Sequence, residues 1–96
     1  MLPFQKIFDS NGNCLAMIIR KDHTGDKTEF YSNPEYSQQV GIIKYHIGGK
    51  IKPHYHNKLA RQVIYTQEVL FIRKGSVRID LFDPDLIFVD SIILKK

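Results

Sequence analysis

Short apolar runs separated by turn-forming residues constrain the fold of this chain more than any other feature. The runs are rich in Val, Ile, Phe and Tyr, which favour β-strands. No window of about a dozen residues repeats its apolar positions with the 3.6-residue period of a helix. The turn-forming clusters between the runs occupy residues 9–13, 32–34, 48–49, 74–75 and 83–85. This pattern predicts an all-β fold, arranged as a sandwich or a barrel.

The apolar runs define a set of expected strands. Asn11-Gly12 is a strong hairpin signal and predicts the first pair of strands. The run at residues 64–73 is the most strand-like, and a two-residue turn at Lys74-Gly75 is expected to pair it with residues 76–82. The full set of expected strands is residues 4–8, 14–19, 28–31, 40–46, 50–56, 64–73, 76–82 and 86–94.

Length and composition limit the class of protein. The chain has 96 residues, which predicts a single domain over residues 1–96. No run approaches the roughly 20 apolar residues of a membrane helix, and the first residues do not form a secretory signal. Cys14 is the only cysteine, so an internal disulfide is excluded. We therefore expect a cytoplasmic protein without a membrane partner.

The formal net charge of +4 is spread along the chain. A nucleic-acid-binding protein usually shows a basic stripe with interleaved aromatic residues. We identify no such stripe and predict no nucleic-acid partner. Lys50, Lys52, Lys58 and Arg61 lie close together in sequence. They are ordinary solvated side chains, or alternatively a basic rim that attracts an anionic small molecule.

A His-x-His pair is the first candidate site. Successive side chains of a strand point to opposite faces, so the expected strand at residues 50–56 directs His54 and His56 to the same face, with Lys52 beside them. Two imidazoles one pleat apart can bind one metal ion or act as paired catalytic groups. With four histidines in the chain, the pair alone is a weak signal.

Glu68 is the second candidate. In the hairpin expected at Lys74-Gly75, Glu68 lies opposite Leu81 and is the only charged residue on the apolar face. A buried carboxylate costs several kcal/mol unless it is paired, and a metal ion, a histidine or Lys52 could pair with it. The alternative is that Glu68 lies at the mouth of the sheet, where it is solvated or forms a salt bridge.

These residues together resemble the first conserved motif of the cupins. Gly48, five residues, His54-Tyr55-His56, then Glu68, six residues and Gly75 follow the order of that motif. The chain departs from it in the spacer, because residues 57–67 replace the three or four residues of the family. The second cupin motif, with its third histidine, is absent. Over residues 38–94 the chain is similar to small cupins of bacterial surface-polysaccharide and nucleotide-sugar pathways.

The resemblance implies a cupin-like jelly-roll β-barrel or sandwich that is incomplete at its C-terminal strands. An open sheet edge and a small core favour association, so we expect a homodimer. In cupins the motif holds a divalent metal, which implies metal ligands His54, His56 and Glu68. Zinc, iron, manganese and nickel all suit these donors.

The resemblance leaves several functions open. The first is binding of a metal ion, a small sugar-like ligand or both, in polysaccharide biosynthesis. The second is a nucleotide-sugar epimerase or isomerase, with His54 or His56 as the catalytic base and Lys52 and Arg61 binding the diphosphate. The third is a metal-dependent dioxygenase. Whether the chain is an enzyme stays open at this point.

Overall fold

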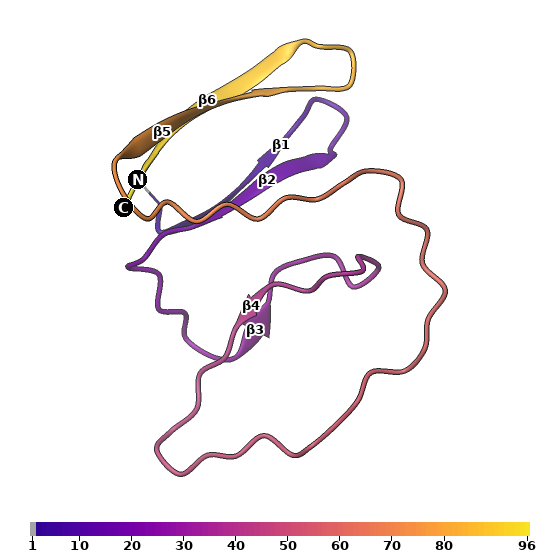
Figure 1. The fold of residues 1–96 in the computed structure, drawn as a ribbon, viewed down its shortest axis with the longest axis vertical. Helices are drawn as coiled ribbons and strands as arrows, with labels where there is room; N and C mark the ends of the chain where they lie inside the picture. Colours follow the sequence, from indigo (N-terminus) through magenta and orange to yellow (C-terminus); the bar gives the residue numbers. More distant parts are fainter. Residues whose placement is uncertain (1) are drawn as a thin grey trace. The chain divides into compact units, whose positions relative to one another are not determined.

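The all-β class is confirmed by the computed structural model, which describes residues 2–96. Its strands form three separate antiparallel pairs, β1–β2, β3–β4 and β5–β6 (Figure 1). Within residues 2–96 there is no helix, and therefore none that could cross a membrane. These strands close no barrel, so the jelly-roll arrangement stays a prediction. The strands are β1 (Phe4–Phe8), β2 (Cys14–Ile19), β3 (Glu29–Phe30), β4 (Gly41–Ile42), β5 (Ser76–Phe82) and β6 (Phe88–Lys95).

The chain divides into two compact units. The first unit contains residues 2–23 and Glu68–Lys96, and the second contains Thr24–Gln67. The first unit therefore holds the β1–β2 and β5–β6 hairpins, and the second holds β3 and β4. The expectation of one domain over residues 1–96 stays a prediction.

The β1–β2 hairpin forms where the sequence predicted it. One carboxylate oxygen of Asp9 accepts hydrogen bonds from the backbone N–H groups of Asn11 and Asn13, each at 2.9 Å. The side-chain amide of Asn13 donates to the other oxygen at 3.1 Å. Gly12 has a φ of 82°, which glycine adopts without steric cost. The hydrogen bonds, above all that from the Asn13 side chain, lower the pKa of Asp9 below its ordinary value of 3.8.

The second hairpin of this unit pairs β5 with β6, with Ile79 opposite Ile92. Asp83 closes the turn, because its carboxylate accepts from the N–H groups of Asp85 and Ile87, each at 2.9 Å. The prediction that residues 64–73 pair with β5 was therefore wrong, and no strand forms at those residues. A tight two-residue turn at Lys74-Gly75 needs a positive φ at its first residue, and only the second, Gly75, has one.

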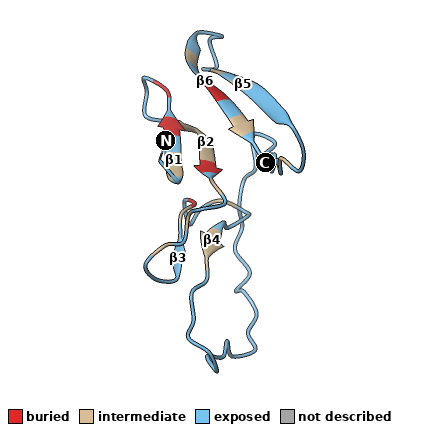
Figure 2. Ribbon diagram, turned by 90° about the vertical axis from the view of Figure 1, so that its left-hand side faces the viewer, coloured by how far each residue is buried: buried red, intermediate tan, exposed pale blue. Residues whose placement is uncertain are grey.

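The core of the first unit is small. Ile7 of β1, Ile18 of β2 and Ile92 of β6 are its buried apolar residues, and Leu81, Val89 and Leu94 pack against them (Figure 2). Both hairpins contribute to this cluster. The core therefore joins the two hairpins of the first unit, and each of them covers apolar surface of the other.

In the second unit, side chains replace part of the expected sheet. The strand expected at residues 40–46 is limited to β4, which pairs Ile42 with Glu29 and Gly41 with Phe30. Beyond β4, the Thr28 hydroxyl accepts from the Lys44 N–H at 2.9 Å and donates to the Lys44 carbonyl at 3.1 Å. A Cβ on Gly41 would lie only 2.5 Å from the carbonyl oxygen of Glu29, so this pairing requires glycine.

Candidate metal centre

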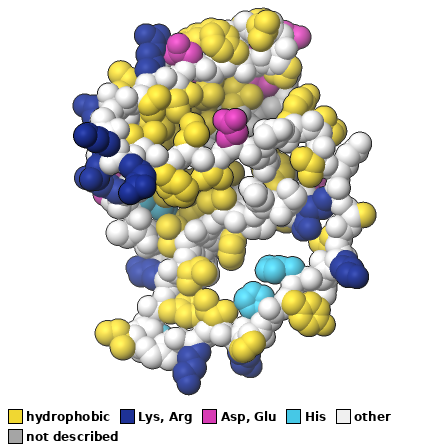
Figure 3. All heavy atoms as spheres, viewed as in Figure 1, with side chains coloured by type: hydrophobic (Ala, Val, Ile, Leu, Met, Phe, Trp, Pro, Cys, Tyr) yellow, Lys and Arg dark blue, Asp and Glu magenta, His cyan; other side chains and the backbone are white. Residues whose placement is uncertain are grey.

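His54 and His56 lie side by side in the second unit. Their ring centroids are 5.4 Å apart and their planes are inclined by 75°. Both residues are exposed, and Figure 3 shows histidine side chains (cyan) open at the molecular surface. The strand expected at residues 50–56 does not form. The two rings are nevertheless close together, although the strand from which the sequence analysis predicted this does not form.

The His54 ring lies within hydrogen-bonding distance of the Lys52 carbonyl oxygen. The Nδ1 atom of His54 is 3.0 Å from this oxygen. A carbonyl oxygen can only accept, so Nδ1 must carry the hydrogen when this bond is made. In the neutral ring the lone pair is then on Nε2, and this is the form of imidazole that binds a metal ion. Metal-binding histidines in proteins are commonly oriented by a hydrogen bond of this kind.

The separation of the two rings suits a shared metal ion. With metal–nitrogen bonds of about 2.0–2.1 Å and a tetrahedral angle, the centroids of two coordinated imidazoles lie about 5 Å apart. The observed 5.4 Å is close to this value. An edge-to-face ring contact without metal has a similar separation. The hydrogen bond to Lys52 is what distinguishes His54 from a ring that is only packed.

Glu68 does not lie where the sequence analysis placed it. Leu81 is opposite Asp90, not Glu68, and Glu68 is exposed rather than on an apolar face. Glu68 is the first residue of Glu68–Lys96, the second of the two stretches that make up the first unit. Both histidines belong to the second unit. Among residues 2–96, no three His, Cys, Asp or Glu side chains form a group that could hold a metal ion. Its role as the third ligand stays a prediction.

Lys52 and Arg61, the predicted anion-binding residues, are both exposed members of the second unit. Arg61 makes only a long contact, 3.5 Å from its Nη2 to the carbonyl oxygen of Pro34. Neither side chain forms an ion pair with another residue of the described chain. Both cationic groups are therefore available to an anionic ligand.

The distribution of charge is a signal that the sequence analysis missed. Residues 36–67 contain five Lys or Arg residues and no Asp or Glu. The rest of the second unit adds Lys27 and the carboxylates Asp26, Glu29 and Glu35, so the unit has six cationic and three anionic side chains and a formal net charge of +3. A net positive charge of this kind attracts anions. Counting charge along the chain, instead of in total, would have found it.

A shallow hollow also lies in the second unit. It has a volume of about 250 Å³ and is lined by Ser37, Gln38, Val63, Thr66 and Gln67. Four of these five side chains carry hydroxyl or amide groups, which can both donate and accept hydrogen bonds.

Comparisons with protein-family models, with curated proteins and with solved structures gave no match. The resemblance to cupins therefore rests on the motif residues alone, which are Gly48, His54, His56, Glu68 and Gly75. Any function must be argued from the geometry of this chain.

Proposed function

We propose that this chain binds a divalent metal ion through His54 and His56 and that it acts as a cupin-like binding protein for a small, anionic, sugar-like ligand. The observation that carries the proposal is the imidazole pair, with centroids 5.4 Å apart and Nδ1 of His54 held by the Lys52 carbonyl. These features support His54 as a first ligand, oriented by its contact with Lys52, and His56 as a second ligand within reach of the same ion.

Glu68 is the proposed third ligand. Two imidazoles and one carboxylate form a set that suits iron(II), and zinc, manganese and nickel accept the same donors. Residues 57–67, which form no strand, link His56 to Glu68. A fully extended linker of this length spans about 35–40 Å, which is ample to bring the carboxylate to the ion.

The proposed organic ligand follows from the charge of the second unit. Lys52 and Arg61 belong to the stretch without carboxylates, and their cationic groups can bind phosphate oxygens. The polar lining of the hollow at Ser37 and Thr66 suits sugar hydroxyls. A ligand that carries both groups, such as a nucleotide-sugar, fits this chemistry, and a role in polysaccharide biosynthesis is proposed from the cupin resemblance.

Metal titration by calorimetry tests the proposal. Zinc, manganese, nickel and anaerobic iron(II) are added in turn to the chain and to its His54→Ala, His56→Ala and His46→Ala variants. We expect one ion per chain, with binding abolished in the first two variants and retained in His46→Ala. Glu68→Gln should weaken binding if the carboxylate is the third ligand. Absence of binding by the unaltered chain, or equal losses in all three histidine variants, would contradict the proposal.

A second candidate function is a nucleotide-sugar epimerase or isomerase, which the carboxylate-free stretch favours. In this reaction His54 or His56 would remove a proton next to a carbonyl group of the sugar. Incubation of the chain with nucleotide-sugars in deuterated water would show exchange of that proton by nuclear magnetic resonance. Oxygen consumption in the presence of iron(II) would instead identify the dioxygenase alternative. If neither proton exchange nor oxygen consumption is detected, the proposal of a binding protein is retained.

A further inference from the structure

The turn of the β1–β2 hairpin contains a reactive pair of residues. Asn11 is followed by Gly12, whereas no other asparagine of the chain precedes a glycine. In an Asn-Gly pair the backbone nitrogen of the glycine can attack the side-chain amide of the asparagine, because glycine has no Cβ to hinder the approach. Both residues are exposed, and the space beside the Cα of Gly12 is open, so water reaches them.

The reaction of such a pair is deamidation, and its only co-reactant is water. The Gly12 nitrogen forms a bond to Cγ of Asn11, and the side-chain nitrogen leaves as ammonia with the proton that the Gly12 nitrogen gives up through water. Water then opens the resulting succinimide ring at either carbonyl carbon. One product is aspartate with an unaltered backbone. The other is isoaspartate, whose main chain runs through the former side chain and is longer by a methylene group.

The folded turn opposes this reaction. The Gly12 N–H donates to the Asp9 carbonyl oxygen at 3.1 Å. The Asp9 carboxylate accepts from the N–H groups of Asn11 and Asn13, each at 2.9 Å. Attack on Cγ requires the Gly12 nitrogen to lose its proton, so its hydrogen bond must break and the turn must open first. Each hydrogen bond of this kind lowers the open fraction by roughly 2–12-fold.

The β5–β6 hairpin has the same turn, with an aspartate in place of the asparagine. The Asp83 carboxylate accepts from the N–H groups of Asp85 and Ile87, each at 2.9 Å. The Leu86 N–H donates to the Asp83 carbonyl oxygen at 2.9 Å, and Leu86 has a positive φ of 64°. Asp85 therefore occupies the position that Asn11 has in the first turn. An aspartate product fits this turn, whereas isoaspartate lengthens the main chain between the bonded groups.

We propose that Asn11 is a site of spontaneous deamidation, that the Asp9 turn restrains the reaction in the folded hairpin, and that the isoaspartate product no longer forms this turn. The rate of deamidation then measures how often the turn opens. The reaction also adds a negative charge to the hairpin, because a neutral amide becomes a carboxylate. This inference is independent of the proposed metal site, and its test alters none of the proposed ligands.

Mass spectrometry of the peptide that contains residue 11, after incubation at mildly alkaline pH, measures the rate. We expect the folded chain to deamidate at least about tenfold more slowly than the chain in concentrated guanidinium chloride. Asp9→Ala removes three side-chain hydrogen bonds of the turn and should accelerate the folded chain by about tenfold. No deamidation in the denatured chain, equal rates in folded and denatured chains, or an unchanged rate in Asp9→Ala would overturn the proposal.

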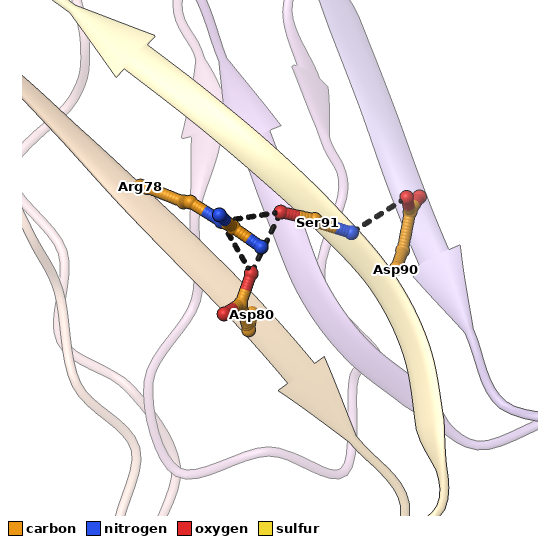
Figure 4. A network of polar contacts seen from close by, with 4 residues as sticks. All are labelled: Arg78, Asp80, Asp90 and Ser91. Carbon is orange, nitrogen blue, oxygen red and sulfur yellow. Dashed lines mark hydrogen bonds and ion pairs between the residues drawn. The ribbon is translucent and has the colours of Figure 1, made fainter.

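Asp83→Ala is the matched control, because it removes the corresponding bonds from the other turn. The β5–β6 hairpin keeps a second polar contact, in which Arg78 donates to Asp80 and to Ser91 at 3.0 and 3.2 Å (Figure 4). The rate at Asn11 should therefore stay within about twofold of that in the unaltered chain. Similar acceleration in both variants would show that general unfolding, and not opening of the first turn, exposes Asn11, which would refute the restraint.

Hydrogen exchange tests the effect of the two products on the hairpin. Asn11→Asp has the sequence of the aspartate product and should keep slow amide exchange in β1 and β2. The isoaspartate chain, obtained by ageing in denaturant, refolding and chromatography, should lose it. Slow exchange in the isoaspartate chain, or its loss in Asn11→Asp, would contradict the assigned effect of the longer main chain.

Discussion

Replacement of Ile92 by alanine should distinguish the core of the first unit from its surface more clearly than any other single change. Ile92 is 8% exposed and packs with Ile7 and Ile18. Its neighbour on β6, Ile93, is 57% exposed and lies on the opposite face of the strand. The two residues have the same side chain, the same strand and adjacent positions, so they form a matched pair.

The size of the effect follows from these exposures. Isoleucine has three more carbon atoms than alanine, and burial of each contributes about 0.8 kcal/mol. At Ile92 nearly all of this is lost, and a small cavity penalty brings the expected destabilisation to about 2–3 kcal/mol. At Ile93 less than half of the side chain is buried, so the loss should be about 1 kcal/mol or less. The expected difference between the two variants is therefore at least twofold.

Urea unfolding followed by circular dichroism measures this difference. For a small unit with a slope near 1 kcal/mol per molar urea, the midpoint should fall by about 2–3 M for Ile92→Ala and by at most about 1 M for Ile93→Ala. If Ile92→Ala does not fold, Ile92→Val, which should cost about 0.5–1.5 kcal/mol, is compared with Ile93→Val instead. Equal midpoints within either pair would show that the isoleucine cluster is not the core.

Three further predictions concern the turns and the close backbone contact. The pKa of Asp9 is below 3.8 in the folded chain, so its contribution to stability is present above that pH and is lost as the pH falls through the lowered value. Asp9→Asn should make the loss of stability between pH 5 and 2 shallower in acid titrations, and an unchanged profile would contradict this. Gly12→Ala should destabilise the first hairpin by about 1–2 kcal/mol in urea unfolding, because of its φ of 82° alone. Gly12→Asn should destabilise the hairpin less than Gly12→Ala, because asparagine adopts a positive φ more readily than alanine. Equal destabilisation by the two variants would contradict this reasoning. Gly41→Ala should abolish amide protection in β3 and β4 in hydrogen exchange, because its Cβ would meet the Glu29 carbonyl, and retained protection would show that the pairing tolerates a side chain.

The sequence pattern correctly predicted the strands whose turns are stabilised by hydrogen bonds between neighbouring residues. The β1–β2 hairpin was found because Asp9, Asn11 and Gly12 determine its turn within five residues. Residues 76–82 were also identified as a strand, with the bounds that β5 has. In both places the information lies in a few neighbouring residues, so the sequence pattern was sufficient.

The partner of β5 could not be obtained in this way. Two apolar runs, residues 64–73 and β6, flank β5 at similar distances, and both begin or end at a turn-forming cluster. The pairing of β5 with β6 is supported by the side-chain hydrogen bonds of Asp83 and by burial of Ile92 against the first hairpin. Burial against a hairpin that is distant in sequence is not visible in a local pattern.

The candidate site stays a prediction. His54 and His56 lie near each other, with ring centroids 5.4 Å apart, although the strand on which this expectation rested does not form. The position of Glu68 was wrong because it relied on the strand pairing that does not form. The hydrogen bond from His54 to the Lys52 carbonyl depends on the local backbone path, and the histidine spacing alone did not predict it.

The composition of the isoleucine cluster has a consequence for synthesis on the ribosome. Ile7 and Ile18 are made early, whereas Ile92 is among the last residues of the printed chain. At about 5–20 residues per second, the apolar face of the first hairpin waits roughly 4–15 s for β6 to be made. During that interval the nascent chain presents an uncovered apolar ribbon, which is a natural substrate for a chaperone at the exit tunnel.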